Sequence, residues 1–168
     1  MSENQPAIRE TFRMAMRHIA STVHAITALH AHECHGILAT AVSSLSFDPP
    51  SLLVCINQAA SLHSPITQAE LFGVNVLGLD NRDVAERFAE ARGAERFSVG
   101  DWSIDHGAPV LLGAQSAMLC RRVDCHTFGT HTIVVGELVE AWHRQNGAPL
   151  TYYDRSYIDI SAAPVSTL

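Results

Sequence analysis

The sequence predicts a mainly β fold, an antiparallel barrel that carries a few peripheral helices. From Ala114 onward, apolar and polar residues alternate with a period of two, which is typical of long antiparallel strands. The expected helices are few and clustered rather than placed between successive strands, which argues against a parallel βαβ sheet. The length of 168 residues, 47% of them hydrophobic, indicates one domain over residues 1–168, with a core at about 12–160.

The chain is expected to begin with an amphipathic helix followed by a hairpin. Residues 6–20 place apolar side chains at near-helical spacing. These side chains are Ile8, Phe12, Met16 and Ile19. The β-branched and small residues of 23–29 predict a strand, and the segment 37–44 predicts its partner. The polar stretch 30–36 would join the two strands.

A proline pair then interrupts the chain. Asp48-Pro49-Pro50 can continue neither a helix nor a strand ladder, and the apolar run 51–56 that follows predicts a buried strand. Ser64-Pro65 predicts an N-cap with proline at the first helical position, so we expect a short helix that ends before a strand at 72–77.

The second half of the chain is expected to hold one more helix and two long strands. Asp80 or Asn81 can cap the helix. Its apolar stripe would be Val84, Ala85, Phe88 and Ala91. Period-two alternation predicts one strand through Ala117, Leu119 and Val123 and another through Ile133, Val135 and Val139.

Composition excludes several classes of function. The net charge of −6 argues against nucleic-acid binding, which needs a basic surface. All eleven cationic residues are arginine, and the absence of lysine excludes Schiff-base chemistry, pyridoxal phosphate attachment and a Walker P-loop. No apolar run of 18 residues occurs that could span a membrane.

The N-terminal residues lack the basic and apolar regions of a secretion signal, so we expect a cytoplasmic protein. The reducing cytoplasm would keep Cys34, Cys55, Cys120 and Cys125 as thiols, most simply as buried structural residues. Cys120 and Cys125 stand five positions apart within one expected strand, and this odd offset predicts that they point to opposite faces.

The segment Gly36–Pro50, with the sequence GILATAVSSLSFDPP, combines small residues and hydroxyls before a rigid stop. Its backbone N–H groups could closely approach an anionic or planar ligand. The same composition also fits an ordinary edge strand, so the segment alone leaves both interpretations open.

Several stretches together resemble the short-chain flavin reductases, the small components of two-component flavin monooxygenases, including the 4-hydroxyphenylacetate 3-monooxygenase reductase component. The resemblance runs from about Phe12 to Tyr157. Its pieces are Gly36–Pro50, Leu53–Asn57, Val74–Leu77, Arg96-Phe97 with Trp102, Gly107–Leu111, Gly129-Thr130-His131, and Pro149-Leu150 leading to Tyr152-Tyr153. Each piece is ordinary by itself, and their order and spacing are specific.

The resemblance implies a homodimeric, antiparallel Greek-key barrel of the FMN-binding split barrel type. It also implies an NAD(P)H:flavin oxidoreductase that transfers hydride from NADH or NADPH to FMN or FAD and supplies reduced flavin to a partner monooxygenase. Because the flavin carries the redox chemistry, we expect neither a catalytic side chain nor a metal ion.

Site residues are carried over from the family position by position. The expected flavin contacts lie in three stretches, with Asn75 nearby: Leu38, Ala39, Thr40 and Ala41, then Ser43 and Ser44, then Cys55–Ser61 with Cys55, Ile56, Asn57, Gln58 and Ser61. His131, which ends the Gly-Thr-His triplet, is associated with nicotinamide binding, and His126 is a weaker candidate. Leu38 and Ala41 stand where the family commonly has Thr and Ser, so two hydroxyl donors for the flavin are missing.

Two alternatives from other classes remain. One is a non-catalytic flavin-binding split barrel, which would lack the nicotinamide role of His131. The other is a zinc-dependent binding module built on the H-x-H-x-C-H cluster of His30, His32, Cys34 and His35. Structural zinc sites usually draw ligands from two separated clusters, so a polar hairpin tip is the simpler interpretation of these four residues.

Overall fold

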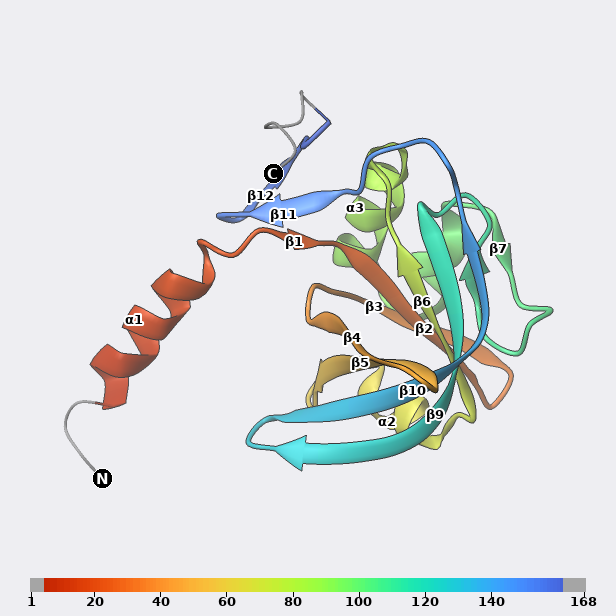
Figure 1. Cartoon of the computed structure of the whole chain (residues 1–168), viewed down its shortest axis with the longest axis horizontal. Helices are drawn as coiled ribbons and strands as arrows, with labels where there is room; N and C mark the ends of the chain where they lie inside the picture. The colour runs from red at the N-terminus through yellow and green to blue at the C-terminus, as the bar shows by residue number, and fades with distance from the viewer. Residues whose placement is uncertain (1–4, 162–168) are drawn as a thin grey trace.

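The computed structural model describes residues 5–161, which form a mainly antiparallel β structure with three α-helices (Figure 1). The elements in chain order are α1 (Gln5–Met16), β1 (Ser21–Thr22), β2 (His24–His30), β3 (Glu33–Ala39), β4 (Val42–Phe47), β5 (Pro50–Asn57), α2 (His63–Gln68), β6 (Leu71–Val76), η1 (Leu79–Asn81), α3 (Arg82–Glu90), η2 (Gly93–Ser98), β7 (Trp102–Ser103), β8 (Val110–Leu111), β9 (Ser116–Phe128), β10 (His131–His143), β11 (Thr151–Tyr153) and β12 (Ser156–Ile158).

Seven strands form one antiparallel sheet in the order β3-β2-β6-β9-β10-β5-β4. The two edge strands, β3 and β4, follow each other in the sequence and are joined only by Thr40 and Ala41. A link of two residues spans only about 10 Å, so the sheet must curl until its two edges meet. The result is a barrel that stays split along β3 and β4 (Figure 1).

Alternation along β2 divides the buried side chains between two hydrophobic clusters. Ile26 and Ala28 point into a cluster that also holds Val54, Ile66 and Phe72. This cluster fills the barrel, and α2 contributes to it.

The second cluster lies outside the barrel wall. Val23 and Ala25 point into it, and it also holds Leu77, Val84 and Phe88. Through this cluster, α3 packs against the sheet. Two smaller sheets, β1-β11-β12 and β7-β8, extend this outer layer.

The structure confirms the antiparallel β prediction and changes several local details. The first hairpin turns at Ala31 and His32, so the polar segment from Glu33 already belongs to β3. Alternation along β5 leaves Leu53 half-buried, which contradicts the expected buried run. Ser64 is not the N-cap of α2 that the sequence predicted. The helix begins one residue earlier, at His63, and its N-cap is Leu62.

Further along the chain, Asn81 occupies the predicted N-cap position of α3, but its side chain makes no capping hydrogen bond and instead accepts one from the Gly78 N–H. The prediction for β10 chose the wrong face of the strand. Thr132, Val134 and Gly136 are buried, whereas Ile133, on the predicted face, is only half-buried. None of the helices in residues 5–161 is both long and apolar enough to cross a membrane.

The expected opposite orientation of Cys120 and Cys125 is wrong. Arg122 pairs with Gly136 and Asp124 pairs with Val135, so Val123 is an extra residue on β9. Such a bulge reverses the alternation beyond it. Both cysteines therefore pack against the cluster inside the barrel, and all four cysteines of the chain are free thiols.

Candidate functional site

A cleft of about 440 Å³ lies where the barrel is split. The end of β3, the Thr40–Ala41 link, β5 and the start of β10 form its walls. Its lining consists of Ile37, Leu38, Ala39, Thr40, Ala41, Cys55, Asn57, Ala60, Arg96 and His131. Mostly small and apolar side chains with a few polar groups are typical of a site for a planar organic ligand.

Hydrogen bonds hold the strand ends that border the cleft. The backbone N–H of Cys55 donates to the Ala41 carbonyl at 2.9 Å, which ties the link to β5. His24 Nδ1 donates to the Ala39 carbonyl at 3.3 Å, and burial lowers the pKa of this imidazole. His24 is therefore neutral at pH 7 and serves the end of β3 as a hydrogen-bond donor.

Arg96 is the one arginine of the cleft lining. Its Nη1 donates to the Gly36 carbonyl and, at 3.2 Å, to Ser61 Oγ, while Nε donates to the Ala91 carbonyl at 3.0 Å. Partial burial lowers the pKa of the Arg96 guanidinium, and the charge of Arg92 lowers it further. An arginine nevertheless stays protonated, so the cleft has a fixed positive charge.

His131 begins β10 at the rim of the cleft and is exposed. Its Nδ1 lies 2.9 Å from Thr130 Oγ1, and its carbonyl accepts a bond from Gln58 Nε2 at 3.5 Å. Gly129, with a φ of 57°, makes the tight turn that brings β10 back along β9. The imidazole is thus placed by the turn and remains open to a ligand.

The structure brings together seven of the residues predicted from the family: Leu38, Ala39, Thr40, Ala41, Cys55, Asn57 and His131. Gln58 and Ser61 are exposed and are not part of the lining, and they are hydrogen-bonded to His131 and Arg96 respectively. Ser43 and Ser44 are exposed on β4, beyond the link.

Ile56 and Asn75 are not brought to the cleft. Ile56 is fully buried inside the barrel, because alternation along β5 directs it away from Cys55. Asn75 is also fully buried: its Nδ2 donates to the Ala25 carbonyl at 3.0 Å and its Oδ1 accepts from Leu111 N–H at 2.8 Å. These bonds tie β6 to β2 and β8, so the amide has a structural role.

Two lining residues, Ile37 and Arg96, were not predicted, and Ala60 lies within the predicted stretch Cys55–Ser61. Ile37 belongs to the segment already singled out, so extending the set by one residue would have included it. Arg96 was noted only as part of the family resemblance. It lies 60 residues from Gly36 in the sequence, and no local pattern joins the two.

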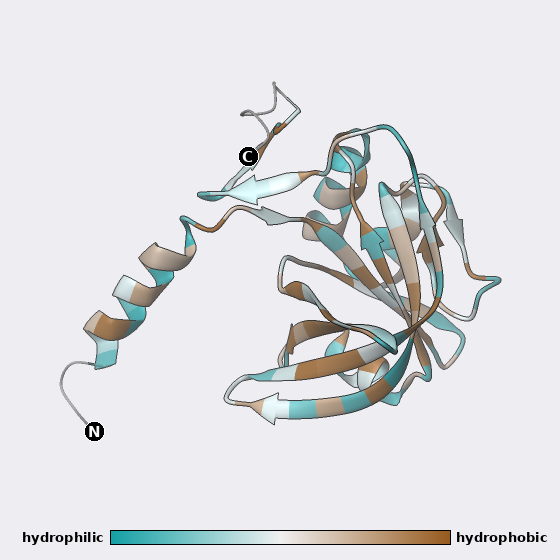
Figure 2. Ribbon diagram, viewed as in Figure 1, coloured by the Kyte–Doolittle hydropathy of each residue, from teal (hydrophilic) through white to brown (hydrophobic). Residues whose placement is uncertain are grey.

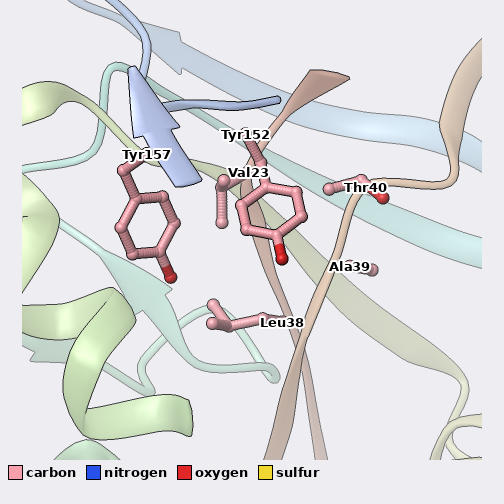
Figure 3. A pocket seen from close by; sticks show the side chains of 6 residues that line it. All are labelled: Val23, Leu38, Ala39, Thr40, Tyr152 and Tyr157. Carbon is pink, nitrogen blue, oxygen red and sulfur yellow. The ribbon is translucent and has the colours of Figure 1, made fainter. Parts of the chain in front are cut away.

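A second hollow of about 280 Å³ adjoins the cleft, because Leu38, Ala39 and Thr40 line both. Figure 3 shows the rings of Tyr152 and Tyr157 extending from the β11–β12 hairpin toward Leu38. The two rings meet edge to face with centroids 5.8 Å apart. Burial is the main reason why the pKa of Tyr157 is raised, so its phenol is neutral and can donate a hydrogen bond.

The described residues contain no group of side chains that fits the zinc-binding alternative. His30, His32, Cys34 and His35 lie around the first hairpin turn, and the rings of His30 and His35 are 6.4 Å apart. Nowhere in residues 5–161 do three His, Cys, Asp or Glu side chains gather in a way that could hold a metal ion.

The residues of the cleft fit a flavin. Alanine and aliphatic side chains form walls suited to an apolar ring, and Thr40 and Asn57 offer hydrogen bonds. The Arg96 guanidinium suits an anionic phosphate. The lining residues are therefore compatible with a flavin in this cleft.

Comparison with known proteins agrees with this geometry. Residues 16–161 match the flavin reductase like domain. The chain is 37% identical over 163 residues to the reductase component of an FADH2-dependent resorcinol hydroxylase from Rhizobium sp. (strain MTP-10005), covering 95% of this chain and 91% of that protein. It is 36% identical over 160 residues to the FMN reductase (NADH) RutF of Stutzerimonas stutzeri (strain A1501), and this match covers 94% of this chain and 92% of that protein.

A solved structure shares the fold. The NADH:FAD oxidoreductase SgcE6 of Streptomyces globisporus C-1027, in complex with NAD and FAD fragments, superposes with a TM-score of 0.85. The sequence identity is 25%, over 94% of this chain and 95% of that chain. The domain match and the identity to relatives over nearly the whole length show that the chain belongs to the flavin reductase-like family.

Proposed function

We propose that this chain is an NAD(P)H-dependent flavin reductase whose reaction takes place in the cleft at Thr40. The observation that carries the proposal is the gathering of the Leu38–Ala41 segment, Arg96 and His131 around one cleft in a chain of this family. NADH:flavin reductases among its relatives support the use of flavin and NAD(H).

The protein's part in the reaction is to bind and orient. A bound flavin supplies the redox chemistry by accepting hydride from the pyridine nucleotide. The apolar walls of the cleft exclude water and hold a ring in place, while Arg96 offers positive charge to a phosphate. To His131, at the open rim, we assign the positioning of the nicotinamide. No side chain of the cleft is needed as a nucleophile.

A flavin-dependent monooxygenase is the partner we propose, receiving the reduced flavin. The similarity to a reductase component of a resorcinol hydroxylase supports this assignment. We place the protein in the cytoplasm, because the reaction draws on pyridine nucleotide.

We further propose that the protein is a homodimer. None of the residues of α1 is buried, and the helix stands clear of the barrel (Figure 1). Figure 2 shows brown apolar positions between teal polar ones along this helix, and Ile8 and Phe12 are 58% and 65% exposed. A twelve-residue helix is only marginally stable alone, and a second copy of the chain would cover its apolar stripe.

The experiment that tests the function is a steady-state assay of NADH and NADPH oxidation with added FMN or FAD. We expect turnover that EDTA does not change. Flavin binding without any turnover would indicate the non-catalytic flavin carrier instead. Neither binding nor turnover with any flavin would contradict both assignments.

Arg96 provides a residue-specific test of the cleft. We expect Arg96→Ala to raise the Kd for FMN by roughly tenfold, because a charge-assisted hydrogen bond to phosphate contributes about 1.5–3 kcal/mol and water replaces part of it. Arg92→Ala, a neighbouring exposed arginine outside the lining, is the matched control. Fluorescence titration measures both Kd values, and equal effects of the two changes would remove Arg96 from the site.

A further inference from the structure

A groove of about 240 Å³ lies between the C-terminal end of α1 and the β11–β12 turn. Its lining includes Arg13, Arg17, Thr40, Tyr152, Asp154 and Arg155. The Asp154 N–H donates to the Arg17 carbonyl at 3.2 Å, which joins the turn to the end of the helix. The groove is thus built by two elements that are far apart in the sequence and side by side in Figure 1.

The charge of the groove is positive. Three guanidinium-bearing residues line it, against the single carboxylate of Asp154. Arg13 is paired with Glu10, with Nη2 and Oε1 2.6 Å apart. Within residues 5–161 no carboxylate lies within 4.0 Å of the guanidinium of Arg17 or Arg155. Two arginines therefore remain available to an anion.

Arg155 occupies an unfavourable backbone position. Asp154 and Arg155 form the two-residue turn of the hairpin, with φ values of 43° and 69°. Positive φ at both positions is the pattern of a type I′ turn, in which glycine is preferred at the second position. Glycine would adopt this backbone conformation with less strain than arginine. The requirements of the turn therefore do not explain why an arginine stands at position 155.

The groove adjoins the candidate flavin cleft at Thr40. Thr40 lines the groove, the cleft and the second hollow, which holds Tyr152 and Tyr157, and Tyr152 lines both the groove and that second hollow. A ligand whose flavin or nicotinamide end occupies the cleft could therefore reach the arginines with a part that extends past Thr40.

We propose that the groove binds the adenosine diphosphate moiety of a dinucleotide, with its phosphates against Arg17 and Arg155. This inference rests on the proposed function, which places a flavin and a pyridine nucleotide in the adjoining cleft. FAD and NAD(P)H both carry this moiety, and FMN lacks it. The groove thus makes the protein favour FAD over FMN or bind the pyridine nucleotide's adenylate end.

The test compares FMN, FAD, NADH and ADP binding to the full chain by calorimetric titration. The variants are Arg17→Ala and Arg155→Gly, with Arg9→Ala on the same helix as the control outside the groove. We expect each groove variant to raise the Kd for ADP and for at least one dinucleotide roughly tenfold, and the Kd for FMN less than about twofold. Arg155→Gly should leave the melting temperature unchanged or raise it, since it relieves the turn.

The outcomes separate the sources and the proposals. Weakened FAD binding assigns the moiety to the flavin, whereas weakened NADH binding with unchanged FAD binding assigns it to the pyridine nucleotide. Unchanged affinity for ADP, FAD and NADH overturns the proposal, as does an equal loss for FMN and FAD. Turnover of FMN by the unaltered protein tests the proposed function independently of these results.

Discussion

At the scale of single residues, His131 is the side chain whose role is most directly testable. We expect His131→Ala to raise the KM for NAD(P)H and to lower kcat/KM by roughly 5- to 30-fold, which corresponds to about 1–2 kcal/mol of lost transition-state stabilisation. The physical reason is the loss of a hydrogen bond from an imidazole already held at the rim by Thr130. Steady-state kinetics at saturating flavin measures the effect.

The control for this change is His126→Ala, an exposed histidine on β9 outside the cleft lining. It should leave the KM for NAD(P)H unchanged. Normal NAD(P)H kinetics with weakened flavin binding in His131→Ala would mean that the two ligands had been assigned to the wrong residues.

The sequence could predict some residues of the cleft lining and not others. The Leu38–Ala41 segment could be found because its members are consecutive and the family resemblance rests on them. The position of Arg96 depends on η2 packing beside β3, which no local pattern encodes. Asn75 lies in the resembling stretch too, but its amide is used by the Leu111 N–H inside the fold.

At the scale of elements, Gly136 allows β10, a strand of the barrel wall, to pack closely against the Phe72 ring inside the barrel. A Cβ there would overlap Phe72 Cζ and lie 2.8 Å from Cys120 Cβ, so Gly136→Ala must displace a buried ring. We expect a loss of about 1–3 kcal/mol in the free energy of unfolding, measured by urea denaturation. Gly113→Ala, whose Cβ would meet only Asn81 Nδ2 at 3.9 Å, should change it by less than about 0.5 kcal/mol.

An ion pair joins η1 to the segment after β10 and makes stability depend on pH. Arg144 donates from Nη1 and Nη2 to the two Asp80 oxygens at 2.6 and 2.8 Å, and this bonding lowers the pKa of Asp80. A carboxyl whose pKa is lower in the folded state contributes stability at neutral pH that is lost as the pH falls through that pKa.

Asp80→Asn should therefore reduce the free energy of unfolding at pH 7, by no more than about 1 kcal/mol because the pair is largely exposed. The difference from the unaltered protein should shrink in acid, where Asp80 is protonated in both states. Urea denaturation at a series of pH values measures it, and a difference that persists at the lowest pH would exclude the ion pair as its cause.

Period-two alternation predicted the long strands, but it could not predict where they depart from regularity. Thr40 and Ala41 continue a β-like composition, so the sequence shows no break where the chain passes from β3 to β4. The bulge at Val123 likewise leaves no compositional sign and reverses the side to which Cys125 points. Both departures depend on the curvature of the closed sheet, which only the long-range pairing of strands determines.

At the scale of the whole molecule, α1 is the helix whose apolar side chains the barrel leaves uncovered. Ile8 and Phe12 share one face of the helix, and Met14 lies on the other at 100° per residue. If a second copy covers the apolar stripe, Phe12→Glu would bury a carboxylate in the interface and separate the subunits. Met14→Glu adds the same charge on the opposite face and should leave the dimer intact.

Sedimentation velocity at micromolar concentration distinguishes these cases. We expect a dimer for the unaltered chain and for Met14→Glu, and a monomer for Phe12→Glu. The barrel core makes no use of Phe12, so far-ultraviolet circular dichroism of the monomeric variant should change only by part of the α1 signal. A monomeric unaltered protein, or a dimer that survives Phe12→Glu, would show that this helix does not join the two copies.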